Sequence, residues 1–167
     1  MAATRGDGLL HPIALGAVAL LLLNDHVLKA AAPGWVTGKL SDVAGLAFFP
    51  LFLQALWELL GPRRGAFQPS RRVLVAACWA TALVFAGVKT WPPMAALYRE
   101  GLGWLQLPLR VLVAVAQGRS PPGHQSVRLI LDTTDLLALP AVGLALWAGG
   151  RRALRQGATQ MGSTTRS

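Results

Sequence analysis

The sequence predicts an all-α fold of the polytopic integral membrane class, a bundle of four transmembrane helices. Three observations predict it. Of the 167 residues, 53% are hydrophobic and only 14% are charged, whereas about 25% of residues are charged in soluble proteins. The apolar residues are collected in four long runs, and most charges lie at the ends of these runs or in the connectors between them. The arginines are concentrated in alternate connectors, which is typical of multi-pass membrane proteins.

The four apolar runs extend over Leu9 to Leu23, Leu40 to Leu60, Val73 to Val88, and Leu136 to Ala148. A helix needs about 20 residues to cross the hydrocarbon layer, and three of the runs are shorter than that. Each reaches the required length when it continues through the polar residues at one end. The runs therefore predict helices over about 9–29, 39–60, 73–91 and 132–149. They form one predicted domain, residues 1–155, and the polar residues 156–167 predict a disordered cytoplasmic tail.

The distribution of arginine predicts the orientation in the membrane. The connector between the second and third helices, residues 61–72, carries four arginines and no acidic residue. Short connectors rich in Lys or Arg remain in the cytoplasm. With four crossings, both termini share that side, which then holds nine arginines against Asp7 and Glu58. The preference for Arg over Lys, with abundant Ala, Gly and Leu, indicates a bacterial inner (plasma) membrane protein.

The connection between the third and fourth helices contains a further apolar stretch, Leu102 to Ala116. It includes Pro108 and Arg110, and glycines stand at its start. We expect an interfacial helix or a re-entrant segment rather than a fifth crossing. A full crossing would move the arginines of the C-terminal tail to the outer side, against the distribution described above.

Each predicted helix has one polar end, and these ends alternate along the chain. Antiparallel crossings bring such ends to the same side of the membrane, here the outer side. The sequence therefore predicts one polar cluster at the outward ends of the bundle, a candidate site for a ligand or ion. It comprises Asn24, Asp25, His26, Lys29, Lys39, Ser41, Asp42, Lys89, Asp132 and Asp135.

The spacing within this cluster predicts specific pairs. Asp25 and Lys29 are four residues apart, so they share a helix face if the first helix continues that far. Asp132 and Asp135 are three apart and repel each other unless a cation, a proton or a lysine lies between them. Lys89 is one of three candidate lysine partners. In a purely structural interpretation, Asp132 is the N-cap of the fourth helix and Asp135 is its third residue.

Three functional hypotheses follow. Ionisable residues at membrane depth usually mark function, so the cluster predicts a cation, proton or small-ligand binding or translocation site. Alternatively, the chain is a membrane-embedded hydrolase or transferase that acts on a lipid-linked substrate. A divalent metal would then be held by Asp25, His26, Asp42, Asp132 and Asp135. In the third hypothesis, the chain is a non-catalytic accessory or assembly subunit with a purely structural charge network.

The partners predicted by the sequence follow from the same distribution of charge. The net charge of +9 is a feature of many nucleic-acid-binding proteins. Here, however, the basic residues stand in short connectors between apolar runs rather than on a solvated surface, so we expect no nucleic acid. The expected partners are the lipid bilayer and a second copy of the chain or a membrane partner protein.

Overall fold

The computed structural model describes residues 4–32, 34–61 and 67–152. Every regular element in these ranges is a helix, which confirms the all-α prediction. Four helices are long and apolar enough to cross a membrane: Pro12–Ala31, Trp35–Leu60, Arg71–Thr90 and Thr133–Arg152. The predicted tail, residues 156–167, lies outside the described residues, as do four of the predicted inner-side arginines, Arg63, Arg64, Arg155 and Arg166.

The first long helix follows a short 3-10 turn, η1 (Asp7–Leu10), and changes its hydrogen-bonding pattern near its end. It begins as α1 (Pro12–Leu23), where the proline at the first position and the His11 side chain, which accepts from the Ile13 amide, form the start. It continues as a π-helical turn, η2 (Asn24–Leu28), and ends in α2 (Lys29–Ala31). The side chains of α1 are apolar on every face of the helix, as expected for a membrane span.

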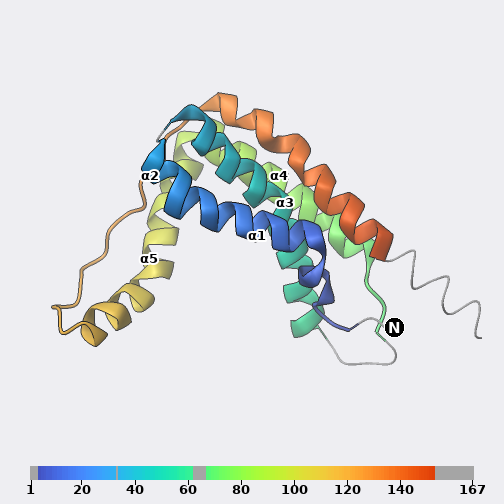
Figure 1. The fold of residues 1–167 in the computed structure, drawn as a ribbon, viewed down its shortest axis with the longest axis horizontal. Helices are drawn as coiled ribbons and strands as arrows, with labels where there is room; N and C mark the ends of the chain where they lie inside the picture. The colour runs from blue at the N-terminus through green and yellow to red at the C-terminus, as the bar shows by residue number, and fades with distance from the viewer. Residues whose placement is uncertain (1–3, 33, 62–66, 153–167) are drawn as a thin grey trace, which may run out of the picture. The chain divides into compact units, whose positions relative to one another are not determined.

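The second long helix, α3 (Trp35–Leu60), packs against α1 (Figure 1). Its buried face contains small residues at helical spacing, which allow two helix backbones to approach closely. These small residues are Ala44, Ala47 and Ala55, and the larger Leu51 is buried in the same helix. Pro50 lies within this helix and is also buried.

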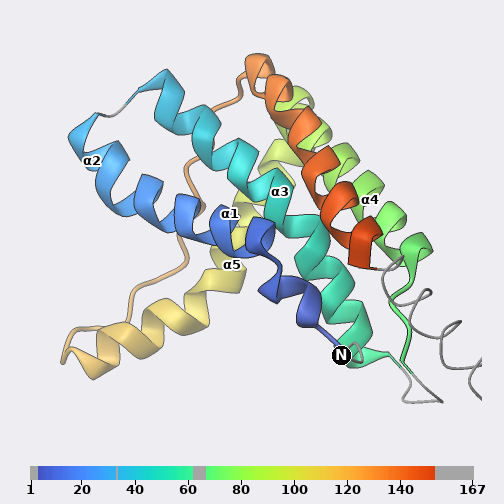
Figure 2. The same cartoon turned by 45° about the vertical axis from the view of Figure 1, so that its right-hand side comes forward.

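The third long helix, α4 (Arg71–Thr90), lies beside the C-terminal helix (Thr133–Arg152), as Figure 2 shows. The C-terminal helix starts as a 3-10 helix, η3 (Thr133–Ala141), and continues as an α-helix. A Cβ atom on Gly149 would be only 2.5 Å from the Leu74 side chain. A larger residue at position 149 would require the Leu74 side chain to shift, so the glycine allows the two helices to pack closely here.

The chain divides into two compact units. The first comprises the residues up to Leu83 and from Leu137 onward, and the second comprises residues 84–136. The first unit contains α1, α3, the larger part of α4 and most of the C-terminal helix. The second unit contains the end of α4, the helix α5 (Pro92–Ala116), the connection that follows it and the start of the C-terminal helix. The polar ends of α1 and α3 thus belong to the first unit, and those of α4 and the C-terminal helix to the second.

In the second unit, α5 starts only one residue after α4, so the apolar stretch 102–116 is part of a longer helix. This helix is not among the four with the composition of a membrane span, because Arg99, Glu100 and Arg110 interrupt it. Whether it lies in the interface or re-enters the membrane stays a prediction.

Residues 123–128, here called the strap, lie along α5. The Val127 amide donates to the Arg99 carbonyl oxygen at 3.1 Å, and the Arg110 guanidinium donates to the Gln125 amide oxygen at 2.6 Å. The His124 ring stacks on Trp104, with 4.4 Å between the ring centres. His124 is therefore a packed side chain that helps to hold the strap on the helix.

Candidate functional site

In the first unit, Asn24 fastens the end of the first span to the start of α3. Its side chain is fully buried. The Asn24 Nδ2 atom donates to the Thr37 carbonyl oxygen and to the Ser41 hydroxyl, both at 2.7 Å. Asn24 is also the first residue of the π-helical turn, a distortion that is frequent at functional sites because it redirects side chains.

The neighbouring Asp25 is part of the same network. Its Oδ1 atom accepts from the Lys29 ammonium at 2.6 Å and from the Ser41 hydroxyl at 3.0 Å. The pairing of Asp25 with Lys29, expected from their spacing, is thus confirmed. About half of each side chain is exposed. An ion pair of this exposure contributes at most about 1 kcal/mol in water, so in the first unit the buried hydrogen bonds of Asn24 carry more of the stability.

The Asn24 amide oxygen is buried and accepts no hydrogen bond from the described residues. Its orientation follows from the two acceptors that Nδ2 contacts, because only the nitrogen of the amide can donate to the Thr37 carbonyl oxygen. Leaving a buried acceptor unsatisfied costs roughly 1–3 kcal/mol. This oxygen is therefore suited to accept a hydrogen bond from a bound donor or to contact a cation.

In the second unit, Lys89 and Asp135 form a buried ion pair. The Lys89 ammonium is 2.5 Å from the Asp135 Oδ2 atom, and both side chains are only about a tenth exposed. The ammonium also lies 5.5 Å from the centre of the Phe85 ring, an arrangement in which the ring face attracts the cation. The end of α4 thus meets the start of the C-terminal helix, as predicted for antiparallel neighbours.

Asp132 begins the C-terminal helix as its N-cap. Its Oδ1 atom accepts from the Thr134 backbone amide at 2.8 Å and from the Thr134 hydroxyl at 2.6 Å. Asp135 is the third residue of the helix, so the predicted capping arrangement is confirmed. Asp132 and Asp135 consequently have separate roles, one as a cap and the other in the ion pair.

The remaining predicted site residues belong to the first unit. His26 is exposed on the π-helical turn, and Asp42 is half-buried near the start of α3. The Lys39 ammonium lies 5.1 Å from the centre of the Trp35 ring. The meeting of all ten residues in one cluster stays a prediction, since the structure establishes two groups, one in each unit.

The predicted metal site receives no support from this geometry. Among the described residues, no three His, Cys, Asp or Glu side chains come together in a way that could hold a metal ion. The Ser41 hydroxyl donates to Asp25 and accepts from Asn24, so it is part of a hydrogen-bond network. Metal binding stays a hypothesis from the sequence.

Sequence reasoning missed a third polar cluster, at the opposite end of α3. The buried Glu58 carboxylate accepts from the Arg152 guanidinium at 2.9 Å and from the Gly6 amide at 3.0 Å. Arg152 also contacts Asp7, and Arg5 donates to the Glu58 carbonyl oxygen at 2.6 Å. The available signal was Glu58 itself, an acidic residue inside the apolar run Leu40 to Leu60, because a buried acid needs a partner.

No protein-family model, no curated protein and no solved structure matches this chain.

Proposed function

We propose that this chain is a multi-pass membrane protein that binds and translocates a proton or a small cation at the outward ends of its helices. Four described helices have the length and composition needed to cross a bilayer. The arginine-rich connector supports an orientation in a bacterial inner membrane with both termini in the cytoplasm. The lipid bilayer is then the first partner of the protein.

The Lys89–Asp135 pair is the single observation that carries the ion-binding proposal. Its charged atoms are 2.5 Å apart, and both side chains are nearly covered by protein. Removing charges from water costs several kcal/mol per ion, so a buried pair is often no more stable than apolar residues of similar volume. Ionisable residues inside membrane proteins usually mark pathways for ions or substrates. A buried pair at the end of an otherwise apolar helix favours such a role.

The pair provides a mechanism for exchange. While the Lys89 ammonium donates to Asp135, the two charges balance. A proton or cation that binds to the Asp135 carboxylate must displace the Lys89 ammonium, because two positive charges on one carboxylate repel each other. Ion binding is thereby coupled to movement of the Lys89 side chain at the end of α4. A chain with four spans is small for a carrier, so translocation requires a second copy or a membrane partner protein.

A structural role is the second candidate, and the satisfied state of the described charges favours it. Asp25 contacts Lys29, and Asp135 contacts Lys89. Asp132 caps the C-terminal helix. These contacts satisfy the charges at the helix ends without any ligand, as expected of an accessory or assembly subunit. A membrane hydrolase or transferase remains a hypothesis from the sequence.

Ion flux across liposomes distinguishes the two candidates. The purified protein is reconstituted into liposomes that contain a dye selective for protons, Na⁺ or K⁺, and a gradient of the corresponding ion is imposed. We expect the wild type to dissipate a gradient and the double variant Lys89→Met with Asp135→Leu to behave as empty liposomes do. This double variant leaves no unpaired buried charge, so it should remain folded.

The matched control is Glu100→Gln, which neutralises an exposed acidic residue in the same unit and should keep the wild-type flux. The ion-binding proposal is wrong if wild-type liposomes retain all three gradients as well as empty liposomes do. The structural role then gains support if the exchanged pair, Lys89→Asp with Asp135→Lys, unfolds at the same temperature as the wild type while each single variant unfolds earlier.

A further inference from the structure

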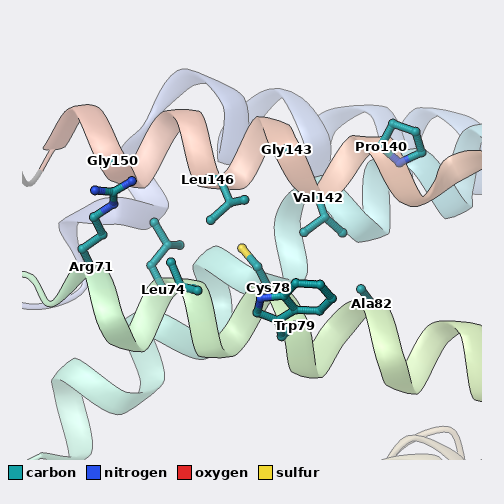
Figure 3. Close-up of a pocket in the computed structure, with 11 residues that line it drawn as sticks. Arg71, Leu74, Cys78, Trp79, Ala82, Pro140, Val142, Gly143, Leu146 and Gly150 are labelled. Carbon is teal, nitrogen blue, oxygen red and sulfur yellow. The ribbon is translucent and has the colours of Figure 1, made fainter.

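An apolar groove runs between α4 and the C-terminal helix, within the first unit (Figure 3). Its volume is about 600 Å³, which is within the usual range of small-molecule sites. Apolar side chains from both helices form the walls, among them Leu74, Trp79, Val142 and Leu146. The residues that line it include no acidic side chain. Within the described part of the chain, Arg71 is the one charged residue in the lining.

The two helices give the groove two different ends. Figure 3 shows Arg71 beside Gly150 at one end and Ala82 near Pro140 at the other. Among the described residues, no acidic side chain pairs with Arg71. The exposed Arg71 guanidinium gives this end of the groove a positive charge. The groove is thus amphipathic along its length, with a cationic mouth and an apolar interior.

The length of the groove corresponds to one leaflet of a bilayer. From Arg71 to Ala82, a rise of about 1.5 Å per residue gives roughly 16 Å. Half of a hydrocarbon core about 30 Å thick is about 15 Å. A single acyl chain with its headgroup at Arg71 therefore extends to the Ala82 end. In the proposed orientation, Arg71 is at the cytoplasmic surface, where anionic lipids attract basic residues.

We infer that this groove binds one anionic phospholipid of the inner leaflet, with an acyl chain between the two helices and the phosphate on Arg71. A guanidinium matches the geometry of a phosphate and can donate two parallel hydrogen bonds to it. The absence of acidic residues from the lining favours an anionic over a zwitterionic headgroup. This inference rests on the membrane location within the proposed function and is independent of ion binding.

One glycine position allows the groove to be filled, and a second provides a matched control. A Cβ atom on Gly143, in the groove, meets nothing within 4 Å, and the same holds for Gly16, in α1. Gly143→Leu therefore fills the groove, and Gly16→Leu is the matched control for the same change in another span. In the same way, Arg71→Gln removes the charge from the mouth, and Arg72→Gln removes the adjacent charge that does not line the groove.

Native mass spectrometry of the detergent-solubilised protein tests the inference. The probes are phosphatidylglycerol and phosphatidylcholine with identical acyl chains. We expect the wild type to retain one phosphatidylglycerol in preference to phosphatidylcholine. Gly143→Leu should lower binding of both lipids. Arg71→Gln should lower binding of phosphatidylglycerol at least about tenfold, since hydrogen bonds to charged groups contribute about 1.5–3 kcal/mol, and should also reduce the preference, because the positive charge that favours an anionic headgroup is lost. Both control variants should bind as the wild type does.

A second measurement keeps the test decisive if Gly143→Leu fails to fold. One equivalent of phosphatidylglycerol with brominated acyl chains should quench the fluorescence of the wild type more than that of Trp79→Phe, because Trp79 lines the groove. The inference is overturned by equal retention of both lipids, by equal quenching, or by loss of a dimer in Gly143→Leu, which would make a second copy the occupant. If the protein keeps its lipid preference but the liposomes show no ion flux, only the ion-binding proposal is refuted. If the protein is soluble without detergent, the ion-binding and the lipid-binding proposals are both refuted.

Discussion

The Arg152 guanidinium and the Glu58 carboxylate form a buried ion pair across 94 residues of sequence, with two guanidinium nitrogens between 2.9 and 3.2 Å from the carboxylate oxygens. Side chains so widely separated can meet only when the end of the C-terminal helix reaches the end of α3. The same carboxylate accepts from the Gly6 amide, so the segment before α1 is held at this point too. One acid thereby connects three parts of the first unit.

This arrangement predicts that Arg152→Gln strongly destabilises the protein. Breaking a buried pair from one side leaves an uncompensated charge, and the typical cost is about 3–5 kcal/mol. The free energy of unfolding, measured by circular dichroism during titration with dodecyl sulfate, reports the loss. Arg151→Gln is the control, because Arg151 is exposed and stacks on Trp147. Equal stability of the two variants would contradict the role assigned to Glu58.

Asn24 provides a second prediction, for the opposite end of α3. Asn24→Ala removes both hydrogen bonds to the second span and should lower the free energy of unfolding by about 1–3 kcal/mol. Asn24→Asp should be no better, because a carboxylate cannot donate to the Thr37 carbonyl oxygen. The same dodecyl sulfate titration applies. Thr90→Ala is the control, since this exposed hydroxyl donates to the Ala86 carbonyl oxygen of its own helix. A larger loss of stability in Thr90→Ala than in Asn24→Ala would refute the role assigned to Asn24.

The close approach of the strap to α5 predicts a specific effect of one methyl group. A Cβ atom on Gly103 would lie 2.5 Å from the Gln125 carbonyl oxygen, whereas one on Gly101 meets nothing within 4 Å. Gly103→Ala should therefore displace the strap, and trypsin should cleave after Arg128 several-fold faster. Gly101→Ala serves as the control with the same gain in helix propensity. Unchanged cleavage of Gly103→Ala would show that the strap is not held by this contact.

The proposed orientation in the membrane predicts opposite accessibility of two connectors. Cys78 is the only cysteine and is buried, so a Cys78→Ala background accepts single new cysteines at the exposed positions Ser70 and Ser120. A membrane-impermeant maleimide added to intact spheroplasts should label Ser120→Cys and should label Ser70→Cys only after lysis. The reverse pattern would invert the orientation, and labelling of both from outside would require a different number of crossings.

Local features of the chain could be predicted well. The apolar runs predicted four long helices, and the observed bounds differ from the expected ones by a few residues, because helix ends depend on capping. The Asp25–Lys29 contact followed from spacing alone, as did the capping by Asp132, since each involves residues within a single turn of helix. The start of α5 at Pro92, directly after Trp91, was missed, because Pro92 and Pro93 are also typical of loops.

Hydropathy and the periodicity of helices are local properties, so the sequence by itself determined the helical class, the number of apolar spans and the contacts within one turn. Which distant charges meet depends on how the helices pack, and only the tertiary structure decided that Lys89 contacts Asp135, that Arg152 reaches Glu58 and that Asn24 fastens α1 to α3. The physical reason is that a buried charge requires a partner, but its identity is set by the side chains that packing brings within hydrogen-bonding distance.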